Sequence, residues 1–254
     1  MEKTVFICED TLEGIFTGIY DAYASRIGHD KCELAAGDVP LEMFCDYIQV
    51  LPSKEKAEKV IRTLKKQFGE ERFYDLYYVL CSNREDKADV VYKTVVVGLS
   101  NDLHQNLLDH LSNPYVARAF EIRRNVANEV MHIREFIRFQ ELENGLLLSK
   151  ITPQNNILPF LMPHFADRFP LENFMIYDEN RKLAGLHQSR HNWCLAQTEG
   201  LNPKLSSSRS EQERFYGDLF RLFCKTIAIK PRENLNLQRQ MLPLRFRNNM
   251  TEFQ

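Results

Sequence analysis

Four short β-rich runs in the middle of the chain constrain its fold more than any other feature of the sequence. They form two hairpin-like pairs, residues 136–141 with 146–151 and residues 173–177 with 182–187. Asn144-Gly145 joins the first pair and is a strong signal for a tight hairpin turn. Residues 157–168, between the two pairs, have helical spacing despite two prolines. This part of the sequence therefore predicts a small antiparallel sheet with packed helices.

The N-terminal part of the chain is predicted to be mainly helical. Short strands are expected at Thr4–Cys8 and Phe44–Leu51, with a polar, turn-rich stretch between them at Gly28–Pro40. Residues 53–68 carry apolar side chains at helical spacing, and a helical block follows as far as about residue 112.

The predicted fold class is therefore α+β, with a helical block preceding a small antiparallel sheet with packed helices. Asn113-Pro114 marks the start of a further helix, which is expected to reach about Arg134. We expect residues 1–112 to form an N-terminal mixed or helical region. Residues 113–254 are expected to form an α+β region with a basic C-terminal segment, packed as one unit with the first.

One more helix is predicted near the C-terminus. Ser210 and Glu213 form a capping box, in which both side chains satisfy free backbone N–H groups at the start of a helix. The helix is expected to run to about Ile229 and to bury the apolar residues that share one face, which are Phe215, Leu219, Leu222, Phe223 and Ile227.

Charge is distributed unevenly along the chain. Residues 1–110 hold 13 Lys and Arg against 20 Asp and Glu, a net −7. Residues 111–203 are balanced at 10 against 10, and residues 204–254 hold 10 against 5, a net +5. Clustered cations attract phosphates because binding releases condensed counterions, so the C-terminal part is the candidate phosphate-binding region. The alternative is that an acidic and a basic segment pack against each other.

Several classes of protein are disfavoured. The six cysteines include no CxxC pair, which gives no support for structural zinc or an iron–sulfur site. His187 and His191 have the spacing of a helical zinc site but no obvious third ligand, so we expect no metal. No nucleotide or hydrolase motif is present, and no cofactor is expected. No apolar run approaches about 20 residues, which predicts a cytoplasmic protein without membrane contact.

One polar pair lies in the first strand of the predicted first hairpin, and a second follows that hairpin. On a strand, Arg138 and Gln140 share one face, and these side chains suit contacts to phosphate, guanine or another base edge. The alternative for Arg138 is a carboxylate pair that anchors the sheet to the preceding helix. Asn155 and Asn156 fit hydrogen-bonded recognition, or simply turn formation.

Further candidates lie on the predicted helix and in the C-terminal segment. His164 and Arg168 are four residues apart and share a helix face, which suits contact with a phosphate or base. The alternative pairs Arg168 with Asp178 and gives His164 a hydrogen bond near the sheet. Arg239 and Arg245 lie among amide side chains, a composition typical of phosphate- and base-contacting surfaces, or of a solvated terminus that wraps the domain.

Three blocks of sequence resemble a known family: RFQELENG at residues 138–145, PHFADRFP at 163–170 and LQRQMLPLRFRNNMTEF at 237–253. The family comprises bacterial proteins described as probable DNA-metabolism proteins of unknown function. Its members occur alone or fused to uracil-DNA-glycosylase-superfamily domains, and accompany a radical SAM protein with a helix-hairpin-helix region. The resemblance implies a role in DNA repair or modification beside that partner. Gln154, Asn155 and Asn156 stand where members often have acid–His–acid, and amides do not exchange protons near neutral pH.

The leading hypothesis is an accessory nucleic-acid-binding protein in DNA repair or modification that acts with the radical SAM protein. The expected contact residues are Arg138, Gln140, Asn155, Asn156, Arg168, Arg239 and Arg245, with His164 beside them. One alternative is an enzyme acting on a nucleobase or nucleotide, with His164 and Asp178 handling protons. The other is a protein-interaction scaffold for the same partner, which predicts a large apolar surface patch.

Overall fold

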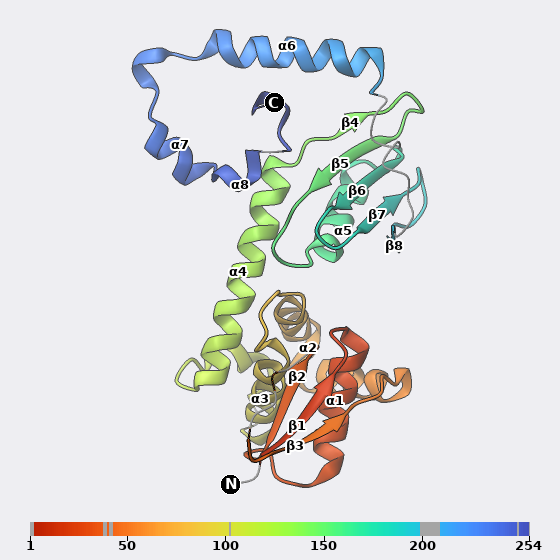
Figure 1. The fold of residues 1–254 in the computed structure, drawn as a ribbon, viewed down its shortest axis with the longest axis vertical. Coiled ribbons are helices and arrows are strands. Elements are labelled where there is room, and N and C mark those ends of the chain that lie inside the picture. The colour runs from red at the N-terminus through yellow and green to blue at the C-terminus, as the bar shows by residue number, and fades with distance from the viewer. Residues whose placement is uncertain are drawn as a thin grey trace. The chain divides into compact units, whose positions relative to one another are not determined.

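The computed structural model describes residues 3–37, 40, 43–101, 103–198, 209–247 and 249–253. The chain divides into two compact units, Met1–Ala127 and Asn128–Gln254 (Figure 1). The division falls inside one helix, α4 (Pro114–Phe136), further along the chain than the boundary expected after residue 112. The fold is α+β, as the sequence predicts, with helices accompanying two small sheets in the described residues.

The first unit is built on a parallel sheet ordered β2-β1-β3, which the sequence did not predict as a sheet. The strands are β1 (Lys3–Cys8), β2 (Cys32–Ala36) and β3 (Cys45–Gln49). The helices are α1 (Leu12–Ser25), α2 (Lys54–Leu80) and α3 (Lys87–Ser100), followed by the 3-10 helix η1 (His104–Asp109). Phe6, Phe16 and Leu64, from a strand and two helices, are buried in its core.

Because β2 lies within Gly28–Pro40, the expectation that this stretch is turn-rich is wrong for residues 32–36. The same stretch includes residues 38 and 39, which lie outside the described part. Only Cys32 and Leu34 of the strand are buried. Two buried positions are too few to show the alternation that identifies a strand in a sequence.

The second unit contains a five-stranded sheet ordered β4-β5-β6-β7-β8. Its strands are β4 (Gln140–Glu141), β5 (Leu147–Ile151), β6 (Phe174–Asp178), β7 (Leu183–His187) and β8 (Cys194–Gln197). Both predicted hairpins are confirmed, because β4 pairs antiparallel with β5 and β6 pairs antiparallel with β7. The prediction of a purely antiparallel sheet is wrong, since β5 and β6 are parallel. The helix between them, α5 (Leu158–Arg168), forms the crossover that a parallel pair requires.

The two faces of this sheet are packed differently. Leu148, Met175 and Ala184 form a buried apolar cluster on one face. On the other face, α5 approaches so closely that a Cβ on Gly185 would lie 2.2 Å from Met162 Sδ. The close approach fixes α5 against the sheet, and with it the side chains that α5 carries on its outer surface.

The C-terminal segments lie at one end of α4 within the second unit (Figure 1). They are α6 (Glu211–Ile227), η3 (Lys230–Arg232), α7 (Leu235–Met241), α8 (Leu244–Arg247) and η4 (Thr251–Phe253). Phe246 of α8 is buried and its ring packs with His132 and Phe136 of α4. Among the described helices, none combines the length and apolar character needed to cross a bilayer.

The predicted capping box of α6 forms only in part, and the packing of the helix differs from the prediction. Ser210 Oγ accepts a hydrogen bond from the Glu213 backbone N–H at 3.0 Å, as expected of the capping residue. The Glu213 carboxylate accepts the backbone N–H of Glu141 instead of that of Ser210. The expected burial of the apolar face of α6 is wrong, because all five residues are exposed: Phe215, Leu219, Leu222, Phe223 and Ile227. Helical periodicity shows which residues share a face, but not whether another element covers that face.

Candidate functional site

Three basic side chains converge on the surface formed by α4 and α5, and we call them the cationic cluster: Arg134, His164 and Arg168. All three are exposed. The Arg134 guanidinium donates a hydrogen bond to the backbone carbonyl of Phe160 at 2.7 Å, which fixes it against α5. His164 and Arg168 share the outer face of α5, four residues apart as predicted.

The neighbouring arginines affect the electrostatics of His164. Partial burial lowers the pKa of the His164 imidazole, and the positive charges of Arg134 and then Arg168 lower this pKa further. Asp167 raises the same pKa, but less strongly. The positive charges of the two arginines disfavour protonation of His164. The same positive charges stabilise an anion bound beside them.

The two arginines keep their charge uncompensated by ion pairs. Neither Arg134 nor Arg168 lies within salt-bridge distance of a carboxylate in the described part of the chain. Arg168 instead lies over the Phe169 ring, 5.6 Å from its centroid. The alternative that Arg168 pairs with Asp178 is therefore wrong. Two planar guanidinium groups on one surface suit bidentate contact to phosphate oxygens.

Arg138 is held in a structural role. It precedes the two-residue strand β4 instead of lying within a longer one, so the expected shared strand face with Gln140 does not form. Its guanidinium pairs with Glu252 at 2.7 Å and also donates to the backbone carbonyls of Glu135 and Ile137. This contact is a carboxylate pair, as in the alternative prediction. The partner, Glu252, belongs to the C-terminal segment, so the pair anchors that segment and not the preceding helix. Gln140 is half-buried in β4, paired with Leu148.

The turn between β5 and α5 is organised by Glu129, which sequence reasoning missed. This buried carboxylate accepts hydrogen bonds from the backbone N–H groups of Gln154 and Asn155, both at 2.9 Å. It also accepts one from the Asn155 side-chain amide at 2.7 Å. Asn155 is itself buried, and Asn156 Oδ1 is buried without a hydrogen-bond partner among the described residues. The turn-forming alternative thus accounts for Asn155.

Asp178 closes the second hairpin. Its carboxylate is fully buried, accepts the backbone N–H groups of Asn180 and Arg181, and forms an ion pair with the Arg181 guanidinium at 3.1 Å. Arg181 also donates to the carbonyl of Pro153 in the turn after β5. Asp178 therefore stabilises a junction of two turns, whereas His164 lies on the outer surface of α5.

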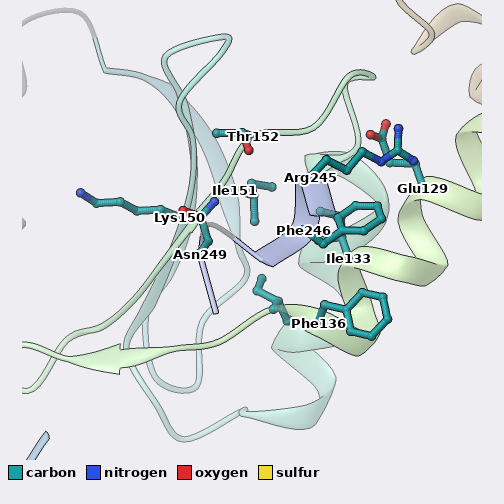
Figure 2. Close-up of a pocket in the computed structure, with 10 residues that line it drawn as sticks. Glu129, Ile133, Phe136, Lys150, Ile151, Thr152, Arg245, Phe246 and Asn249 are labelled. Atoms are coloured by element: carbon teal, nitrogen blue, oxygen red, sulfur yellow. The ribbon is translucent and has the colours of Figure 1, made fainter. Parts of the chain in front are cut away.

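A small hollow lies where α4, β5 and α8 meet (Figure 2). Arg245 and Glu129 lie at one side of it, and Lys150 and Asn249 lie at the other. Its volume of about 20 Å³ holds roughly one water molecule. A nucleobase does not fit, so the hollow offers no substrate pocket in this structure.

The C-terminal segment supplies further exposed cations. Between residues 225 and 247 there are six Lys or Arg and one acidic residue, Glu233. Lys225, Lys230, Arg232 and Arg239 are exposed and form no ion pair with any described residue. Arg245 is exposed and lies over the Phe246 ring, 4.7 Å from its centroid. The predicted residues Arg239 and Arg245 thus belong to a wider basic segment.

The described residues contain no group of three His, Cys, Asp or Glu placed to hold a metal ion. His187 is buried, stacks on Phe174 and hydrogen-bonds to the Glu172 carbonyl. His191 is exposed and its ring bonds to the carbonyl of Ser189.

Comparison with known proteins adds one assignment. No curated protein matches the chain. A family model described as a domain of unknown function, DUF4130, matches residues 85–252. The match takes in the cationic cluster, the Glu129 turn and the basic C-terminal segment. The chain therefore belongs to the DUF4130 family.

Proposed function

We propose that this protein is an accessory nucleic-acid-binding protein in DNA repair or modification, and that the cationic cluster contacts phosphate. The observation that carries the proposal is the grouping of Arg134 and Arg168 with His164, in which neither arginine forms an ion pair with a carboxylate of the described residues. Guanidinium groups in this state bind phosphate without first breaking an ion pair. Arg138 and Arg181, by contrast, would each have to give up a carboxylate partner.

The basic segment 225–247 supports the same proposal. Its cations other than Arg247 are exposed, and amide side chains such as Asn234 and Gln238 lie between them. Each phosphate contact changes the slope of log affinity against log salt by about −0.9 on duplex DNA. Two contacts from the cluster and two from this segment would give a slope of roughly −3 to −4.

The biological setting is proposed from sequence resemblance. The blocks at 138–145, 163–170 and 237–253 resemble the DNA-metabolism family described above, which accompanies a radical SAM protein. The partner chain would supply any iron–sulfur chemistry, and this chain would hold the nucleic acid.

Fluorescence anisotropy with short single- and double-stranded DNA across a salt series tests the proposal. The full chain is compared with Arg168→Gln, Arg134→Gln and the matched control Lys182→Gln, an exposed cation in the turn between β6 and β7. Each arginine change is expected to weaken binding and to reduce the salt slope by about one. The control is expected to change little. Equal losses in all three variants would show that total charge alone matters and would refute the cluster.

A second candidate function is a protein-interaction scaffold for the radical SAM partner, and the exposed apolar face of α6 favours it. Failure to bind DNA even at low salt would move the assignment to the scaffold. The enzymatic alternative has less support, because the hydrogen bonds and ion pair of Asp178 are all made within its own turn.

A further inference from the structure

The helix α6 carries an apolar stripe that the described residues of its own unit leave exposed. We define the stripe as Phe215, Tyr216, Leu219, Leu222 and Phe223, which are 64%, 62%, 49%, 58% and 53% exposed. Soluble proteins rarely leave contiguous apolar surface of this kind free of contacts. The spacing 215, 219, 222 is the alternation of four and three that forms a seam between two helices.

The opposite side of α6 is where its own chain packs. A Cβ on Gly217 would lie 3.7 Å from Thr251 Cγ2 of η4. The Glu213 carboxylate accepts the backbone N–H of Glu141 at 3.2 Å. At about 100° per residue, Gly217 lies roughly 160° around the helix from Leu219. In Figure 1 the C-terminal segment lies on one side of α6, with no described element of the unit on the other.

Apolar residues of the stripe lie on both sides of Leu219 in the sequence of α6. Phe215 and Phe223 lie four residues before and after it. The first turn is acidic, with Glu211, and the last turn is basic, with Lys225. Two such helices that cross antiparallel near Leu219 bring the acidic end of each beside the basic end of the other. A two-fold contact needs a self-complementary surface of this type.

The available area is sufficient for a modest interface. At about 150–250 Å² per aromatic side chain, Phe215, Tyr216 and Phe223 of the stripe leave on the order of 350 Å² uncovered. A two-fold contact uses this area twice, roughly 700 Å², and Leu219 and Leu222 add to it. The total approaches the roughly 1,000 Å² expected of a specific association.

We propose that the apolar stripe of α6 binds the same stripe of a second copy of this chain, antiparallel and about a two-fold axis near Leu219. The ion pairs that set the orientation join Glu211 of one copy to Lys225 of the other. The inference uses none of the cationic cluster, although Lys225 also belongs to the basic segment 225–247.

Sedimentation equilibrium of the full chain, from about 1 to about 100 μM, covers the range in which an interface of this size dissociates. The wild type is expected to form a dimer, and Leu219→Glu is expected to be monomeric. The matched control is Leu171→Glu, since Leu171 is 62% exposed and lies outside α6. A monomeric wild type, or equal effects of the two substitutions, overturns the proposal.

Charge exchange tests the orientation separately. Glu211→Lys and Lys225→Glu are each expected to weaken self-association several-fold, because like charges then meet at both ends of the pair. Mixing the two variants is expected to restore association as a heterodimer, since opposite charges meet again at both ends. Far-ultraviolet circular dichroism checks that α6 remains helical. A mixture no stronger than the single variants contradicts the antiparallel contact.

Discussion

Substituting Glu129 by glutamine tests whether one buried carboxylate organises the turn that leads into α5. Glu129 Oε1 accepts one backbone N–H, from Gln154, and Oε2 accepts two donors from Asn155. Glutamine has the same shape, but its NH₂ group replaces one of these acceptors. In either orientation at least one N–H donor of the turn meets another donor.

The expected loss of stability follows from those contacts. A hydrogen bond to a charged group contributes about 1.5–3 kcal/mol, and a buried donor left without a partner adds a further penalty. For Glu129→Gln we expect the free energy of unfolding to fall by about 2–4 kcal/mol. Glu129→Ala removes all three acceptor contacts and opens a cavity, so its loss is expected to be larger.

Urea unfolding followed by Trp193 fluorescence measures the change. Trp193 is the only tryptophan of the chain, and it reports on the second unit, which contains Glu129. The matched control is Glu135→Gln, an exposed glutamate on the same helix, for which the change is expected to stay within about 0.5 kcal/mol. If both variants unfold at the urea concentration of the wild type, Glu129 does not hold the turn.

Three further predictions concern pH and packing. Because the pKa of His164 is lowered in the free protein, bound phosphate is expected to raise it. DNA affinity should therefore rise as pH falls from about 8 to about 5, and His164→Gln should flatten that dependence in anisotropy titrations. Burial raises the pKa of the Asp89 carboxyl from 3.8 in the unfolded chain to about 6 in the folded protein. The neutral carboxyl is compatible with burial, so the first unit loses stability as pH rises from 3.8 through 6. Asp89→Asn should therefore raise the free energy of unfolding of the first unit by up to about 2 kcal/mol near pH 7 and change it little near pH 4. Gly185→Ala places a Cβ 2.2 Å from Met162 Sδ. It should destabilise the second unit by about 1–3 kcal/mol in urea, with partial recovery in combination with Met162→Ala.

The sequence predicted those parts of the fold that are set by residues adjacent in the chain, such as turns and helix caps. Asn144-Gly145 closes the β4–β5 hairpin, and Ser210 caps α6. The direction of β6 against β5 was not predicted, because it depends on how α5 crosses the sheet. Gly185 and Met162 are in close contact where α5 crosses the sheet. Nothing in the sequence around either residue indicates this contact.

The candidate site was predicted only in part for a similar reason. Polar residue type identified the region, and His164 and Arg168 lie on one helix face as expected. Arg134 was not selected, because a single arginine at the end of a long helix resembles any solvated residue. Glu129 was not selected either, since acidic residues on helices are usually exposed. Its spacing of three from Val126, which is buried, was the one available signal.

Some polar residues of the second unit stabilise the fold through ion pairs and hydrogen bonds, whereas others keep a charge without an ion pair among the described residues. The two groups can be told apart by the effects of substitutions on stability and on DNA binding. Arg138 is engaged by Glu252 and two carbonyl groups, whereas Arg168 has no ion pair among the described residues. Arg138→Gln should lower the free energy of unfolding by about 1–3 kcal/mol, because it leaves the half-buried Glu252 carboxylate unpaired. Arg168→Gln should leave stability within about 0.5 kcal/mol and weaken only DNA binding. Urea unfolding and anisotropy on the same samples give both quantities. The reverse pattern, with Arg168 controlling stability and Arg138 controlling binding alone, would place the phosphate contact at the sheet edge instead of on α5.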